Sequence, residues 1–122
     1  MDLPMFGKNR QDRELAAALG ERRAATNSQA ALRARLGSEL EAEYARWTDL
    51  TRRLALYDTQ ILEQSKGQAQ AALLAYQSDA GDFADVMRAW IDDLDTRLDH
   101  IRLQVQRAQS YAVLANLGGL EQ

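Results

Sequence analysis

The chain of 122 residues has no cysteine, one proline and one histidine, and only 7% of its residues are aromatic. Without cysteine it has no disulfide framework, no thiol nucleophile and no thiolate metal site, and a single histidine excludes a histidine-rich metal cluster. No run of roughly 20 apolar residues suggests a membrane-spanning helix, and no basic segment followed by an apolar run marks a signal peptide. The formal net charge of −3 arises from interleaved charges of both signs, so nucleic-acid binding is not expected.

The chain is instead rich in Ala, Leu, Arg, Gln and Glu, which are all strong helix formers. Valine and isoleucine are scarce, so strands have little to build on. The only proline is Pro4, and the residue before a proline favours extended backbone. We therefore expect an all-α fold that is preceded by an extended lead-in segment over residues 1–10.

Residues 11–77 contain no obligatory helix stop, and a continuous helix of that span would be roughly 100 Å long. Large apolar residues recur every seven positions in its second half, with others at the alternate positions: Leu40, Trp47, Leu54 and Ile61, then Leu36, Leu50 and Tyr57. This spacing is typical of helices that pack as in a coiled coil.

A tip turn is predicted at residues 78–82, because the sequence Ser-Asp-Ala-Gly-Asp there suits a tight helix reversal. Asp82 can cap a second helix over residues 83–117, which ends at Gly118-Gly119 and leaves a tail at 118–122. Apolar residues on this helix alternate spacings of four and three: Met87, Ile91, Leu94, Leu98, Ile101, Val105, Ala108, Ala112 and Ala115. That period of 3.5 predicts left-handed supercoiling against a partner.

Together these elements predict a long antiparallel, coiled-coil-like helical hairpin. Because the first helix is the longer one, residues 11–42 would have no partner within the chain, so we expect assembly into a four-helix bundle or a larger helical barrel. An alternative is a break near Gly37-Ser38, where Ser-x-x-Glu forms a capping box, which would give a three-helix bundle.

The titratable residues give no sign of catalysis. His100 has no companion nucleophile, and a group of aspartates on the second helix points in several directions: Asp92, Asp93, Asp95 and Asp99. Asp93 has the spacing to pair with Arg97. We therefore expect no enzyme activity, no cofactor and no metal site.

Two segments carry a family resemblance. Residues 3–12, LPMFGKNRQD, resemble the "LPLF-x-x-NRQD" segment of TolC-type outer-membrane efflux proteins, most closely the heavy-metal efflux branch. Residues 75–87, AYQSDAGDFADVM, resemble the family's "AY-x-x-G-x-GDF-x-x-VL" tip motif. The resemblance covers the C-terminal periplasmic hairpin of a longer protein. It departs at Asp79, where the family has its first tip glycine.

This resemblance implies one stave of a trimeric efflux channel, whose periplasmic tip docks an adaptor protein that links it to an inner-membrane pump. The implied docking residues are Tyr76, Ser78, Asp79, Gly81, Asp82, Phe83 and Val86. Asp85 matches an acidic pore-lining position, whereas a second such position is Arg88 here. As the family's signal peptide and barrel strands are not seen, we expect a piece of an outer-membrane protein that self-associates as a dimer of hairpins. The alternative is a stand-alone helical coiled-coil interaction or adaptor module.

Overall fold

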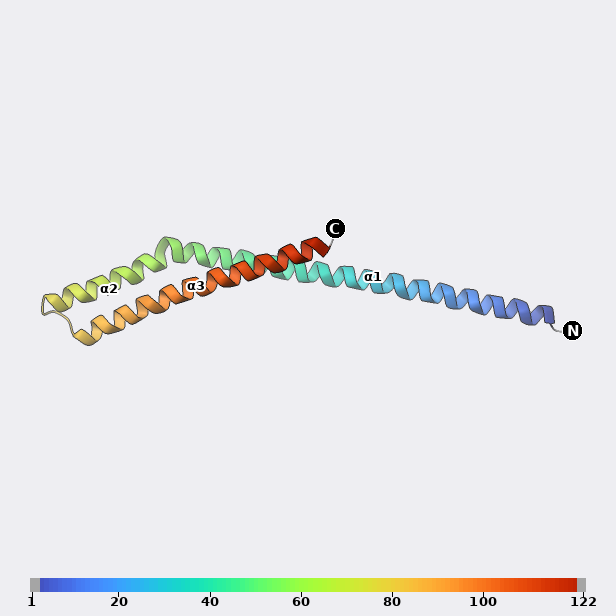
Figure 1. Ribbon diagram of the computed structural model, residues 1–122, viewed down its shortest axis with the longest axis horizontal. Coiled ribbons are helices and arrows are strands. Elements are labelled where there is room, and N and C mark those ends of the chain that lie inside the picture. The colour runs from blue at the N-terminus through green and yellow to red at the C-terminus, as the bar shows by residue number, and fades with distance from the viewer. Residues whose placement is uncertain (1–2, 121–122) are drawn as a thin grey trace. The chain divides into compact units, whose positions relative to one another are not determined.

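A computed structural model describes the backbone of residues 3–120 and the side chains of residues 9–119. The chain divides into two units, Met1–Glu39 and Leu40–Gln122. Its elements in order are helix α1 (Leu3–Leu56), the π-helical turn η1 (Tyr57–Ile61), helix α2 (Leu62–Gln77) and helix α3 (Phe83–Leu120) (Figure 1). The described chain is therefore all-α, as the composition predicts.

The first unit consists of the N-terminal part of α1. Every side chain from residue 9 to residue 35 is exposed, including those of Leu15, Leu19 and Leu32. Because α1 begins at Leu3, the prediction of an extended lead-in segment is wrong for residues 3–10. Pro4 lies in the first helical turn, where a backbone N–H has no intrahelical partner and where the fixed φ of proline suits the helix.

The alternative of a break near Gly37-Ser38 is also wrong, because both residues lie within α1. A capping box requires a non-helical residue at its start, and Ser38 is helical. A glycine inside a helix costs only about 1 kcal/mol relative to alanine, and the surrounding residues Leu36, Glu39 and Leu40 are strong helix formers. The alternative of a three-helix bundle required this break and is therefore wrong as well.

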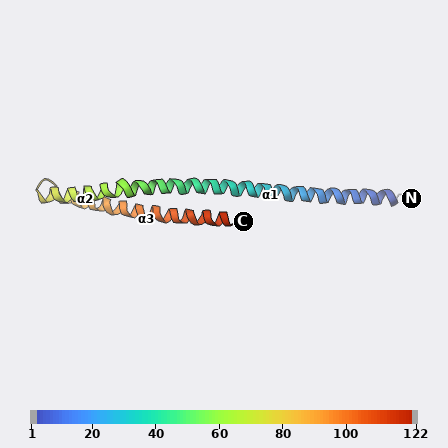
Figure 2. The same cartoon turned by 90° about the horizontal axis from the view of Figure 1, so that it is seen from above.

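The second unit is the predicted antiparallel hairpin. Its first arm runs from residue 40 through η1 and α2, and its second arm is α3, which returns beside the first (Figures 1 and 2). Two polar contacts join the arms. His100 Nε2 lies 2.9 Å from Asp58 Oδ1, and the Ser110 hydroxyl donates a 3.4 Å hydrogen bond to the carbonyl of Glu43.

The seven-residue repeat of the first arm faces α3, as predicted. Leu50 and Leu54 are 5% and 2% exposed, and the other members of the repeat within the second unit are half-buried: Leu40, Trp47, Tyr57 and Ile61. We call the buried interface between the two arms of the second unit the seam. Burial of these side chains is the main force that closes the hairpin.

The π-helical turn shifts this repeat by one residue. Up to the turn, Trp47, Leu54 and Ile61 are seven apart; beyond it, Tyr57 is followed eight residues later by Ser65, and Ile61 by Ala69. A π turn accommodates one extra residue within a helix, so the seam continues past an interruption of its heptad spacing. The helix also bends at this point (Figure 1).

Helix α3 keeps a spacing of seven along its whole seam side. The buried or half-buried positions form two sets, each with this spacing: Val86, Asp93, His100, Arg107 and Leu114, and then Ala89, Thr96, Leu103, Ser110 and Leu117. The helix also continues through Gly118 and Gly119 to Leu120, so the predicted stop is wrong. Neither glycine takes a positive φ, which is the conformation that ends a helix at a glycine.

Candidate functional site

The tip that joins the arms begins with a helix stop at the end of α2. The Ala80 N–H donates to the Ala75 carbonyl at 2.8 Å and the Asp79 N–H to the Tyr76 carbonyl at 3.2 Å. This is the hydrogen-bond pattern of a Schellman motif, which requires a left-handed residue after the helix cap. Asp79 is that residue, with a φ of 59°. The tip therefore places an aspartate where glycine is usual.

Gly81 serves close approach rather than an unusual backbone angle. A Cβ atom built on this residue would lie 3.1 Å from the Cβ of Ala75. The absence of a side chain thus lets the turn fold back onto the last turn of α2. Ser78, at the helix cap, donates its hydroxyl to the Leu74 carbonyl at 2.9 Å.

Helix α3 starts directly after the turn. The Asp82 carbonyl accepts backbone hydrogen bonds from the N–H groups of Asp85 and Val86, at 3.1 and 3.3 Å, so Asp82 occupies the predicted cap position. Asp85 lies in the first helical turn, where a negative charge is favoured by the helix dipole. Its carboxylate is 3.6 Å from the Arg88 guanidinium, so the two side chains form an ion pair at the start of α3.

An aromatic pair connects the two arms at the tip. The rings of Tyr76 on α2 and Phe83 on α3 meet edge to face with centroids 5.7 Å apart, and both side chains are exposed. Val86 differs from the other expected docking residues because it is buried in the seam. It can hold the tip together but does not offer a docking surface.

The π-helical turn carries a second constellation that the sequence did not reveal. His100 of α3 contacts Asp58, and its ring stacks on Tyr57 at 6.0 Å between centroids with 21° between planes. A shallow hollow of about 290 Å³ beside it is lined by Arg53, Tyr57, Asp99, Arg102, Leu103 and Gln106. The only sequence signal was the failure of the heptad after Ile61, where Gln68 stands at the next position.

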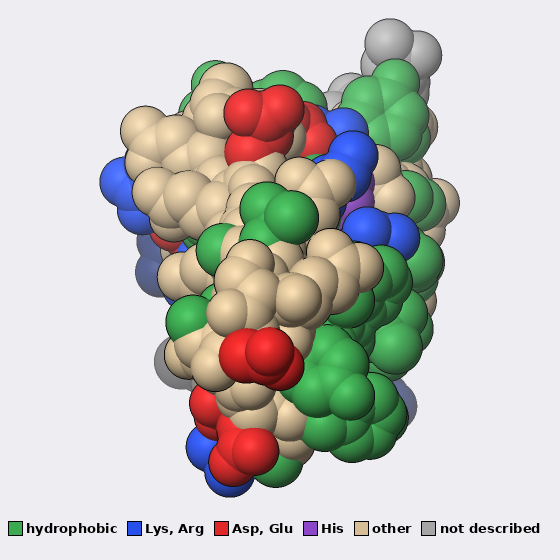
Figure 3. Space-filling view, turned by 90° about the vertical axis from the view of Figure 1, so that its left-hand side faces the viewer, with side chains coloured by type: hydrophobic (Ala, Val, Ile, Leu, Met, Phe, Trp, Pro, Cys, Tyr) green, Lys and Arg blue, Asp and Glu red, His purple; other side chains and the backbone are tan. Residues whose placement is uncertain are grey.

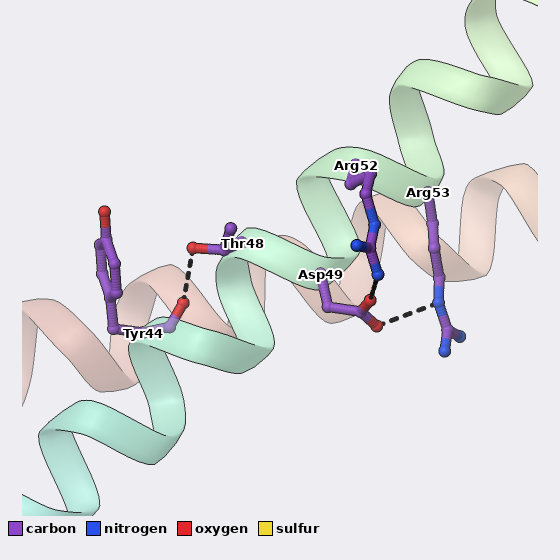
Figure 4. Close-up of polar contacts among 5 residues, drawn as sticks. All are labelled: Tyr44, Thr48, Asp49, Arg52 and Arg53. Carbon is purple, nitrogen blue, oxygen red and sulfur yellow. Dashed lines mark hydrogen bonds and ion pairs between the residues drawn. The ribbon is translucent and has the colours of Figure 1, made fainter.

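Asp93 occupies a seam position instead of an apolar residue. Its Oδ2 is 2.8 Å from the Arg97 guanidinium, which is the predicted pair, but its Oδ1 is buried without a hydrogen-bond partner among the described residues. Among the described residues, the other pairs of Arg with Asp or Glu lie on the surface. Asp49, for example, reaches both Arg52 and Arg53 on the same helix, at 2.6 and 3.0 Å (Figure 4).

The most regular apolar stripe of the chain points away from the seam. We call it the outer face of α3, made of Met87, Ile91, Leu94, Leu98, Ile101, Val105, Ala108, Ala112 and Ala115. Its six large side chains are 46–56% exposed, and its alanines are exposed as well. In the view toward the tip, hydrophobic side chains gather along one flank (Figure 3). The partner expected from the stripe's 3.5-residue period is therefore not the other arm of the hairpin.

Within residues 3–120, no helix combines the length and apolar character needed to cross a membrane. No group of three or more His, Asp or Glu side chains is placed to share a metal ion in this part of the chain.

Comparisons of the chain with protein-family models, with curated proteins and with solved structures gave no match.

Proposed function

We propose that this chain is the periplasmic helical hairpin of a TolC-type outer-membrane efflux channel, of the heavy-metal branch, and that its tip docks a periplasmic adaptor protein. In this proposal three copies of the longer protein form the channel, and the adaptor links it to an inner-membrane pump. The chain has no catalytic role in it and works as a structural wall and a docking end.

The observation that carries the proposal is the position of the turn. The hairpin reverses between Gln77 and Phe83, within the segment that resembles the family's tip motif. The turn is closed by a Schellman motif and a close approach at Gly81, so its shape is well defined. It presents the exposed rings of Tyr76 and Phe83, and exposed aromatic side chains are frequent anchors of protein interfaces.

The charged residues complete the proposed docking end. Asp79 and Asp82 are exposed in the turn, and they give the tip an acidic rim around its aromatic pair. Polar groups at the rim of an interface act mainly on specificity and association rate. Asp85 is proposed to line the pore, where its pair with Arg88 balances one negative charge with one positive charge.

A site-specific cross-linking experiment tests the docking role. A photoreactive phenylalanine analogue is placed at Phe83 in the host's own full-length protein, and cross-linked partners are identified by mass spectrometry. We expect a periplasmic adaptor encoded beside the gene, with a pump gene in the same neighbourhood. The same analogue at Gln104, which is exposed far from the tip, serves as the control and should not capture the adaptor. Capture at Gln104 alone, or gene neighbours without a pump and an adaptor, would contradict the proposal.

The second candidate is a stand-alone helical interaction module. It is favoured by the outer face of α3, because an apolar stripe of this regularity needs a partner whatever the cellular context. The coding sequence upstream of Leu3 separates the two functions. A signal sequence and barrel strands there support the channel, whereas a start codon at Met1 supports the module.

A further inference from the structure

We propose that the outer face of α3 binds the same face of a second copy of this chain, with the two α3 helices antiparallel. The proposal concerns the 122-residue chain on its own and does not rest on the efflux function, because an antiparallel pair is a different assembly from the three-copy channel proposed above. From Met87 to Ala112 the face extends about 38 Å by helix rise. Its six large apolar side chains are half-exposed, and burying a side chain of this kind fully is worth about 1.5–3 kcal/mol.

The side-chain sizes along the face favour the antiparallel arrangement. Large residues occupy the tip-proximal half and alanines the other half. Parallel helices would place Met87 against the partner's Met87 and Ala112 against the partner's Ala112. Such an interface is too wide at one end and too narrow at the other, whereas good packing sets large residues against small ones.

In one antiparallel register, every layer of the interface has a similar total side-chain size. It pairs Met87 with the partner's Ala112, and Ile91 with the partner's Ala108. The central layers then pair Leu94 with the partner's Val105, and Leu98 with the partner's Ile101. Every large residue at the outer layers meets an alanine, so the helix separation stays nearly constant along the face.

The flanking charges select the same register. In an antiparallel coiled coil, a residue on one flank of the core faces the residue that occupies the same heptad position on the partner helix. Here Asp95 faces the partner's Arg102, and the two-fold symmetry repeats this attractive pair. Shifting the register by one heptad either way sets Arg102 against an arginine, either the partner's Arg88 or the partner's Arg102. The parallel arrangement sets Arg97 against the partner's Arg102, which is also repulsive.

The opposite flank of the chosen register adds an aromatic contact. It brings Trp90 near the partner's Tyr111, and both rings are exposed in the single chain. Aromatic pairs contribute beyond the area that they bury. Side-chain size, charge and aromatic placement thus all favour a second copy of the chain bound in this antiparallel register.

A charge-swap series on the whole chain tests the pairing by sedimentation equilibrium. Asp95→Arg alone, or Arg102→Asp alone, turns two attractive pairs into two repulsive ones, so the dimer should weaken about tenfold or more. The double variant D95R/R102D restores opposite charges and should return the dissociation constant to within about threefold of the parent. Arg46→Asp on α1, which is exposed, makes the same charge change away from the face and should leave the dimer unchanged. A strict monomer, a trimer, or single variants that dimerise like the parent would each overturn the proposal.

Disulfide trapping tests the direction, since the chain has no cysteine of its own. Leu98→Cys mixed with Ile101→Cys should give a cross-linked heterodimer on mild oxidation. Leu98→Cys alone should cross-link much less, because in this register two such cysteines lie in different layers. Efficient cross-linking of Leu98→Cys alone, without excess in the mixture, would show parallel helices and overturn the antiparallel alignment.

Discussion

At the scale of single residues, the conformation of Asp79 shows how the tip departs from the sequence pattern it resembles. The Schellman motif places this residue at φ 59°, a region that costs an ordinary L-residue roughly 1–2 kcal/mol and that aspartate tolerates better than most. The hydrogen bonds of Asp79 and Ala80 to the last turn of α2 hold the residue there. The left-handed conformation of Asp79 therefore lowers the stability of the turn somewhat.

We expect Asp79→Gly to raise the free energy of unfolding by about 0.5–1 kcal/mol, because glycine takes a positive φ without steric cost. Urea unfolding followed by circular dichroism at 222 nm measures this change. Asp92→Gly is the matched control: Asp92 is exposed within α3, and there the same substitution should lower the free energy of unfolding by about 0.3 kcal/mol, because glycine is a slightly poorer helix former than aspartate. Equal destabilisation by both variants would show that Asp79 does not adopt the left-handed conformation in solution.

Asp93 is the second residue whose chemistry conflicts with its place. It is 3% exposed, and one of its carboxylate oxygens has no hydrogen-bond partner among the described residues. We expect Asp93→Leu to stabilise the hairpin by about 1–3 kcal/mol, because apolar packing then replaces a buried carboxylate that has an unpartnered oxygen. Arg97 remains solvated in this variant, since its side chain is 53% exposed.

Thermal and urea unfolding of Asp93→Leu are compared with those of Asp99→Leu. Asp99 pairs with Arg102 at 3.2 Å, but its side chain is 51% exposed, so its loss should change stability by no more than about 0.5–1 kcal/mol. Destabilisation of the Asp93 variant would mean that the carboxylate makes a contact in solution that outweighs its burial.

At the scale of elements, the π-helical turn is what lets the first arm stay in register with α3. The seam spacing is eight from the turn residues Tyr57 and Ile61 to Ser65 and Ala69, and it is seven before and after this step. Removing one residue from the turn should therefore leave a plain α-helix whose seam continues with a spacing of seven. We expect deletion of Thr59 to keep the hairpin, with an unfolding free energy within about 1 kcal/mol of the parent.

Deletion of Gln104 provides the contrast. Helix α3 has no extra residue to lose, so this deletion rotates half of its seam away from the first arm and should cost more than about 2 kcal/mol. Both variants are followed by urea unfolding at several protein concentrations. If deleting Thr59 is as damaging as deleting Gln104, the one-residue insertion does not explain the turn.

Periodicity predicted the elements of the hairpin better than it predicted their partners. The repeat of Leu40, Trp47 and Leu54 correctly marked the seam of the first arm, and the turn at residues 78–82 was placed correctly by its glycine and aspartates. Repeats show which residues share a face, but not which surface that face meets. The apolar stripe of α3 was therefore identified while its outward orientation was not. The seam positions His100 and Asp93 are polar, so an apolar repeat could not assign them to the buried interface.

The helix ends and the π-helical turn escaped prediction for related reasons. Proline and glycine were treated as stops at Pro4 and Gly118, although both are tolerated when the surrounding residues favour a helix. The extra residue of η1 shows in the sequence only as an apolar repeat that lapses at Gln68. Such a lapse is equally consistent with a helix that simply leaves the interface.

At the scale of the whole chain, the two units differ in what stabilises their helices. Side chains at residues 9–35 are all exposed, whereas buried side chains recur from Leu50 to Ser110 in the second unit. A long helix in water depends mostly on packing of its apolar face, and local opening is easiest where few apolar contacts are buried. Stability should therefore be uneven along the chain.

Amide hydrogen exchange measured by mass spectrometry checks this expectation. In the chain alone, we expect peptides within residues 9–35 to exchange about 100-fold faster than peptides within residues 47–73 or 86–114. Raising the protein concentration should slow exchange in α3 around Leu94 and Leu98, where the second copy is proposed to bind, and should leave residues 9–35 unchanged. Slow exchange across Leu15 and Leu19 as well would show that a further copy covers the first unit, and the assembly would then involve more than the outer face of α3.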